Sequence, residues 1–155
     1  MLRGITKIEI LIVIFLVVII IAADIFAAQY LNKKSRDINI LSDINQIRSS
    51  LEAYLMINSH YPKASEVISL NDSYLGTEKL CADGFKRLSD ICPKTLLKPV
   101  PNTYFNEGNV YSYKSTDNDS NYQIQFTLNT NFAKFGLKKG VNCAINTTIT
   151  SAACF

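Results

Sequence analysis

Two hydrophobic patterns follow one another in the first sixty residues. From Ile10 to Ala23 the sequence has no polar side chain, whereas beyond Ala28 apolar residues recur at spacings of three and four. The second pattern predicts an amphipathic helix with one apolar face. Its predicted apolar positions are Ile38, Leu41, Ile44, Ile47, Leu51, Tyr54 and Leu55.

Both patterns belong to one predicted helix, from about Ile5 to Asn58. No Gly or Pro interrupts this stretch before Pro62. Asn58, Ser59 and Pro62 then supply a stop signal. The helix therefore has an apolar half, suited to a membrane, and an amphipathic half with a face for a small domain to cover.

The remaining chain, residues 61–155, alternates hydrophobic and polar residues most clearly at Tyr122, Ile124, Phe126 and Leu128. This period of two predicts a strand with one buried face. A partner strand is predicted from Tyr111, with "STDNDSN" as the turn. A third strand is expected around 141–145, and "SEVISL" is expected to open a short helix.

The predicted fold class is α+β: a long N-terminal helix packed against a small antiparallel sheet. A head of this size is marginal on its own. Packing on the amphipathic half of the helix and disulfide bonds would offset that weakness.

Four cysteines, Cys81, Cys92, Cys143 and Cys154, form two groups with the same spacing. Metal-site spacing such as C-x-x-C is absent. Four cysteines allow three connectivities, of which Cys81–Cys92 and Cys143–Cys154 is the most economical, each bridge contributing roughly 3 kcal/mol in the chain-entropy model. Disulfides need an oxidising compartment, so the head is expected outside the cytoplasm; four buried free thiols are the alternative.

The weak charge balance and the lack of catalytic motifs argue against several classes of function. The formal net charge is +3, and the head carries only slightly more basic than acidic residues. No nucleic-acid partner is expected from so weak a balance. The one histidine, His60, lies in the turn-like "NSHYP" and is read as a solvated turn residue. No nucleophile–base pair or phosphate loop is found, so an enzyme is not expected and no cofactor is predicted.

A weak metal candidate lies in the predicted hairpin turn. Asp117, Asp119 and Asn121 alternate like the first ligands of a calcium loop. Tyr122 stands where that loop needs Gly, and Leu128 stands where it needs Glu. A solvated turn explains the three residues without a metal.

The segment "RGITKIE" before the apolar run resembles the start of a type IV prepilin or a type II secretion pseudopilin. The resemblance implies that a prepilin peptidase cuts after Gly4 and methylates the new N-terminus at Ile5. It also implies that Glu9 guides assembly with other pilin subunits on an inner-membrane platform. "NSHYP" and the Tyr-rich hairpin also resemble the family. Lys7 and Asp24 depart from its usual apolar pattern.

The resemblance divides the chain into a leader (1–4), a transmembrane or filament-core helix (5–29), the amphipathic half of that helix (30–60) and a head (61–155). It implies a single-pass protein of the cytoplasmic membrane that later enters a surface or periplasmic filament. Other interpretations stay open. The apolar run also fits a signal peptide cleaved after "ADIFAA", or the anchor of an extracytoplasmic binding module that does not polymerise.

Overall fold

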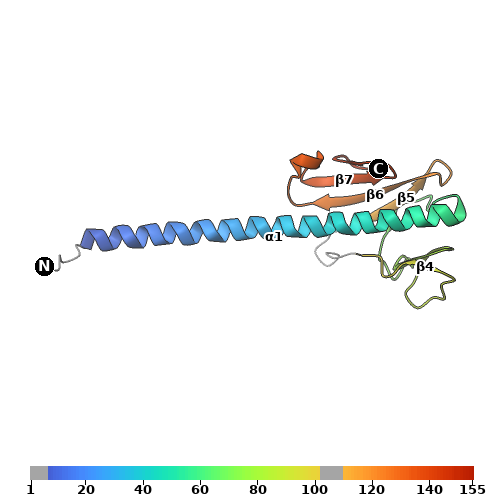
Figure 1. Cartoon of the computed structure of the whole chain (residues 1–155), viewed down its shortest axis with the longest axis horizontal. Helices are drawn as coiled ribbons and strands as arrows, with labels where there is room; N and C mark the ends of the chain where they lie inside the picture. The colour runs from blue at the N-terminus through green and yellow to red at the C-terminus, as the bar shows by residue number, and fades with distance from the viewer. Residues whose placement is uncertain (1–6, 102–109) are drawn as a thin grey trace. The chain divides into compact units, whose positions relative to one another are not determined.

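The computed structural model describes residues 7–101 and 110–155. The chain consists of two compact units, Met1–Ser35 and Arg36–Phe155, and helix α1 (Lys7–Asn58) runs from the first into the second (Figure 1). The α+β class predicted from the sequence is confirmed. The predicted helix start at Ile5 lies outside the described residues.

Helix α1 ends where the sequence predicts. Ser59 adopts a left-handed conformation, with φ of 61°, and its N–H donates to the carbonyl of Leu55 at 2.7 Å. The Asn58 side chain donates to the carbonyls of Tyr54 and Ala82, at 3.2 and 2.8 Å. These bonds satisfy carbonyls that a helix end leaves without partners.

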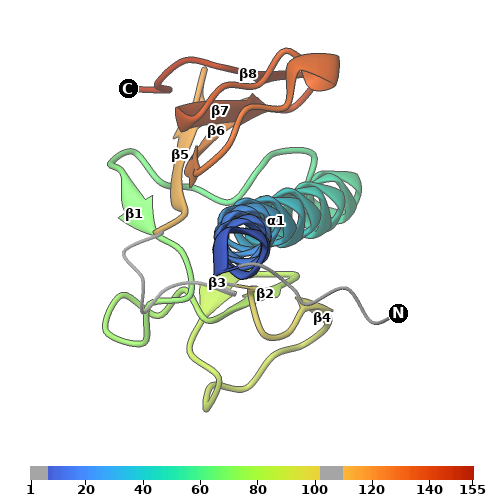
Figure 2. The ribbon, with the colours of Figure 1, turned by 90° about the vertical axis from the view of Figure 1, so that its left-hand side faces the viewer.

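The second unit holds two antiparallel sheets, which lie on opposite sides of α1 (Figures 1 and 2). The larger sheet has the order β1-β5-β6-β7-β8, and the smaller has the order β3-β2-β4. Their strands are β1 (Ile68–Ser69), β2 (Lys79–Cys81), β3 (Gly84–Lys86), β4 (Thr95–Leu97), β5 (Ser112–Thr116), β6 (Asn121–Leu128), β7 (Gly140–Ile145) and β8 (Ile149–Thr150). A short 3₁₀ helix, η2 (Ala133–Phe135), precedes β7.

The predicted hairpin is confirmed as β5 and β6, and the predicted third strand as β7. Tyr113 pairs with Ile124, and Ile124 pairs with Ala144 across the next strand. The alternating side chains of β6 are buried on one face, as the period of two predicts.

Two expectations for the head were wrong. "SEVISL" forms no helix; Ile68 belongs to β1 and pairs with Tyr113. A β-branched pair, Val67 and Ile68, suits a strand, and the chain then turns at Asn71 with φ of 57°. The segment before Pro101, for which the sequence analysis predicted no strand, holds the three-stranded sheet, whose strands have three residues each.

Candidate functional site

Among the described residues of its own unit, none covers the apolar half of α1. Its large side chains are exposed all round; Phe15, for example, is 62% exposed and Leu16 is 53% exposed. Within the described residues α1 is long and apolar enough to cross a membrane. A helix that is hydrophobic all round needs an apolar environment, such as a bilayer or other helices.

The predicted processing site lies at the N-terminal end of this run. Gly4 and Ile5, the expected cleavage residues, lie outside the described residues. Glu9, the expected assembly residue, lies on α1, followed directly by the apolar run. Lys7 is also on α1, and Asp24 follows the run as an exposed residue.

Both disulfides have the connectivity that the sequence favoured. Cys81 is bonded to Cys92 and Cys143 to Cys154, with Cα–Cα distances of 5.7 and 5.1 Å. Each closes a loop of the same sequence separation, 11 residues. The first bridge encloses β3 of the small sheet, and the second ties β7 to the segment after β8.

A buried lysine reinforces the first loop. The side chain of Lys79 is 3% exposed, and its ammonium group donates to the carbonyls of Leu88 and Asp90, at 3.2 and 2.5 Å. Lys86 donates to Asp83 at 2.6 Å and to the carbonyl of Ile91 at 3.1 Å. This hydrogen bond from Lys86 holds the pKa of the Asp83 carboxyl below its usual value.

Two carboxylates on α1 bind residues at the strand ends of the larger sheet, and the sequence pattern indicated neither. Asp37 is fully buried and accepts four hydrogen bonds, from the backbone N–H and the side chains of Asn129 and Thr130, at 2.6 to 3.1 Å. Asp43 accepts a hydrogen bond from the Tyr111 hydroxyl at 2.8 Å. Charged acceptors make stronger hydrogen bonds than neutral ones, so these contacts fix the sheet on the helix.

Buried tyrosines fill the space between α1 and the hairpin. The ring centroids of Tyr61 and Tyr122 are 4.7 Å apart, with the rings edge to face. The hydroxyl of Tyr113 donates to the carbonyl of Pro62 at 2.7 Å, and that of Tyr61 donates to Glu52 at 3.0 Å. Burial raises the pKa of the Tyr113 and Tyr122 hydroxyls above the ordinary tyrosine value.

The weak calcium candidates form a hairpin turn. Asp117 and Asp119 both have left-handed backbone conformations, with φ of 52° and 64°. The Asp117 carboxylate accepts a hydrogen bond from the Asn121 side chain at 2.7 Å, while the Asp119 carbonyl accepts one from Tyr61 N–H at 2.8 Å. Among the described residues, no group of three or more His, Cys, Asp or Glu side chains is placed to hold a metal ion.

His60 lies exposed in the turn after α1, as expected for a solvated turn residue. Its Nδ1 lies 2.8 Å from the Tyr61 carbonyl oxygen, and its ring packs edge to face with that of Tyr54. These two contacts account for the position of the His60 ring.

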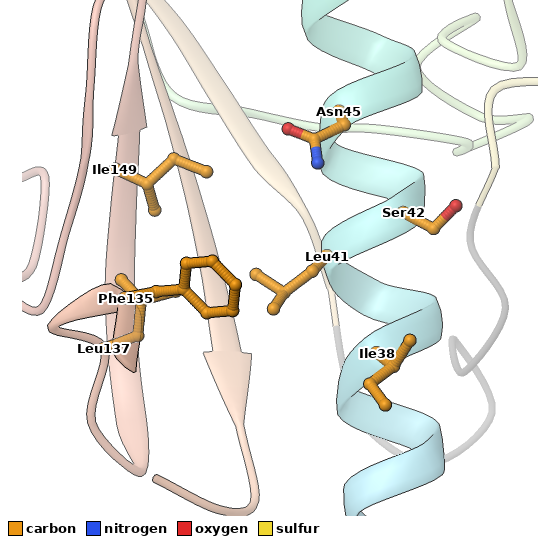
Figure 3. Close-up of a pocket in the computed structure, with 7 residues that line it drawn as sticks. All are labelled: Ile38, Leu41, Ser42, Asn45, Phe135, Leu137 and Ile149. Atoms are coloured by element: carbon orange, nitrogen blue, oxygen red, sulfur yellow. The ribbon is translucent and has the colours of Figure 1, made fainter. Parts of the chain in front are cut away.

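An apolar groove of about 570 Å³ lies between the amphipathic part of α1 and the edge of the larger sheet. Figure 3 shows Phe135 extending from η2 toward Leu41 of α1. Leu137 lines the groove and is 4% exposed, whereas Phe135 is 65% exposed. The lining residues are Ile38, Leu41, Ser42, Asn45, Phe135, Leu137 and Ile149.

Comparison with known proteins gave no match: no family model, no curated protein and no solved structure is significantly similar to this chain.

Proposed function

We propose that the protein is a structural subunit of a type IV pilus-like filament or a type II secretion pseudopilus. The observation that carries this proposal is the order of residues before the apolar run: Arg3, Gly4 and Ile5, then Glu9, then the uninterrupted apolar stretch. A signal peptide or a plain anchor requires neither Gly4 nor Glu9 at these places.

Cleavage after Gly4 would create a positively charged amine at Ile5, close to the apolar stretch. A charged residue within the hydrocarbon costs about 2.5–3.5 kcal/mol on insertion scales, so a carboxylate such as Glu9 gains from an opposite charge nearby. The Ile5 amine of a neighbouring subunit is such a charge. Its attraction to Glu9 would select one axial register between neighbouring helices.

The fold is compatible with this role. The apolar half of α1 is exposed among the described residues, and the second unit has its own core and two disulfides. The disulfides support a head outside the cytoplasm, because such bonds persist in oxidising compartments. In the proposal, the partners are the prepilin peptidase, an inner-membrane assembly platform and other pilin subunits.

The first experiment is the N-terminal mass of the full chain co-expressed with a prepilin peptidase. We expect a mature chain that begins at N-methylated Ile5, and an uncut chain when Gly4 is replaced by leucine. An intact Met1 in the presence of active peptidase would overturn the proposal and leave an anchored binding module. A chain that begins after Ala28 would instead identify a signal peptide.

The second experiment separates processing from assembly. Glu9→Gln removes the charge but keeps the size, and we expect it to be cleaved normally and to form no filament. Glu9→Asp keeps the charge and is expected to assemble in part. Asp24→Asn is the matched control at the other end of the apolar run, and it is expected to assemble. Filaments of normal yield from Glu9→Gln would reject the proposed pairing.

A further inference from the structure

We propose that the apolar groove beside α1 and the lysines around it bind anionic phospholipid at the surface of the bilayer that anchors the chain. The basic face is defined here as this groove together with Lys134, Lys138 and Lys139. The inference requires α1 to be a membrane anchor. It does not require the protein to form filaments.

The groove offers an apolar contact next to a concentrated positive charge. Phe135 and Ile38 are 65% and 52% exposed at its margin. Lys134 precedes Phe135 directly, and Lys138 and Lys139 follow Leu137; all three lysines are exposed. A lipid surface presents the complementary chemistry, with anionic headgroups above apolar chains.

No acid balances these lysines along the C-terminal segment. From Ser120 to Phe155 the sequence contains no Asp or Glu. In the part of the chain that the structure describes, none of the three lysines forms an ion pair. Their charge is therefore available to a partner, and each lysine near an anionic surface strengthens binding about fivefold.

The turn that carries Phe135 is held in a fixed shape. Phe132 and Leu137 exchange two backbone hydrogen bonds, with N···O distances of 2.9 and 3.2 Å. Gly136 closes the turn in a left-handed conformation, with φ of 69°. Because the backbone is already ordered, binding at Phe135 costs little conformational entropy.

The position of the basic face along the chain favours a bilayer as its partner. Asp37 binds Asn129 and Thr130 at the start of the second unit, and Ile38 lines the groove itself. Along the chain, Asp37 lies only nine residues after Ala28, the end of the apolar segment. The groove is therefore tethered within a short distance of any membrane that the apolar segment spans.

A second copy of this chain is a poorer partner. Among the described residues of the second unit, the most exposed large apolar side chain is that of Ile91, at 90%. Ile91 lies between β3 and β4 of the small sheet, and its neighbours in sequence include Arg87 and Lys94, both exposed. The exposed Asp90 beside Ile91 offsets one of these charges, so this surface carries no net negative charge that would attract the basic face.

The absence of tryptophan from the chain permits a direct test. Phe135→Trp introduces a single tryptophan. The full chain is reconstituted in nanodiscs, either of phosphatidylcholine alone or with phosphatidylglycerol added, with brominated acyl chains as the quencher. We expect quenching of the tryptophan fluorescence in the anionic nanodiscs and much weaker quenching in the zwitterionic ones. Equal fluorescence in both would overturn the proposal.

Two controls separate specific docking from general effects. Ile91→Trp places the fluorophore at an exposed position between two strands of the small sheet, and no quenching is expected. In the Phe135→Trp chain, Lys134, Lys138 and Lys139 are then changed to Gln, which should lower the docking equilibrium by about fivefold per lysine. Changing the exposed Lys63, Lys94 and Lys98 instead removes the same charge and should have little effect.

The same samples distinguish a protein partner. If the tryptophan spectrum of the Phe135→Trp chain shifts with the ratio of protein to lipid but bromine does not quench it, a second copy fills the groove and the lipid proposal is rejected. Failure of peptidase cleavage or of filament formation would not affect this result, since quenching needs only an anchored chain. Conversely, an unquenched tryptophan in the Phe135→Trp chain leaves the filament proposal standing.

Discussion

Two regions of α1 share one backbone conformation and differ in what surrounds them. Between Ile10 and Ala23 the side chains are exposed all round, and none can form a hydrogen bond. Between Asp37 and Tyr54 one face is buried, and it includes two carboxylates among its apolar residues. The first region depends on an external apolar environment, whereas the second is stabilised by its own head.

The comparison shows that burial on a helix need not follow hydrophobicity alone. The buried face of the second region includes Asp37, because the strand end at Asn129 and Thr130 supplies donors for it. The side chains of the first region include no hydrogen-bond donors, so a polar side chain there would lack a partner. Substitutions in the second region should therefore change the stability of the head, while substitutions in the first should not.

The largest effect is expected at Asp37. Asp37→Ala leaves the donors of Asn129 and Thr130 without their acceptor and should lower the free energy of unfolding by about 4 kcal/mol. The measurement is urea unfolding of the full chain in detergent micelles, followed by the near-ultraviolet circular dichroism of the tyrosines. Asp24→Ala, the matched acid outside the head, should leave the transition unchanged. A loss below about 1 kcal/mol at Asp37 would contradict its anchoring role.

The two disulfides should have the next largest effect. Because both loops have the same length, the chain-entropy model predicts a loss of about 3 kcal/mol for either double Cys→Ser replacement. Lys79 also holds the loop between Cys81 and Cys92. Removing the Cys81–Cys92 disulfide should therefore lower the free energy of unfolding by no more than removing Cys143–Cys154. Unfolding of each variant under the same conditions tests this. A much larger loss for the Cys81–Cys92 pair would show that Lys79 cannot hold the loop alone.

Three aliphatic substitutions sharpen the comparison along α1. Leu51 is fully buried, and Leu51→Ala should cost about 3 kcal/mol of unfolding free energy. Ile38 is 52% exposed at the groove, and Ile38→Ala should change stability by less than about 0.5 kcal/mol. Leu16→Ala, in the apolar half, should leave the unfolding of the head unaltered. A similar loss at Ile38 and Leu51 would mean that the groove is closed in solution.

The sequence predicted best those features that depend on neighbouring residues. The alternation from Tyr122 to Leu128 gave the hairpin and its buried face. The signals at Asn58 and Ser59 gave the end of α1. The short cysteine spacing gave the favoured connectivity.

Features that depend on distant partners were not predictable in this way. The buried stripe on α1 was expected to include Ile38, but Ile40 is fully buried in its place, and Asp37 lies on the same face. The partners of Asp37 are 92 and 93 residues away, so no local pattern indicates them. The processing residues Gly4 and Ile5 came from a motif, and their role stays a prediction.

The smallest effect expected concerns the pH dependence of the head. Burial raises the pKa of Tyr113, so the folded state keeps its hydroxyl proton at a pH where the unfolded chain, with a pKa of about 10, loses it. This contribution is complete below pH 10 and is lost as the pH rises above that value, by about 1.4 kcal/mol per pH unit for one tyrosine. Tyr113→Phe loses the hydrogen bond to Pro62 at neutral pH, yet its stability should fall less steeply between pH 10 and 11. Tyr74→Phe, at a residue 86% exposed, should keep the slope of the unaltered chain. An unchanged slope for Tyr113→Phe would show that this hydroxyl ionises in the folded state, so that burial between α1 and the hairpin does not protect it.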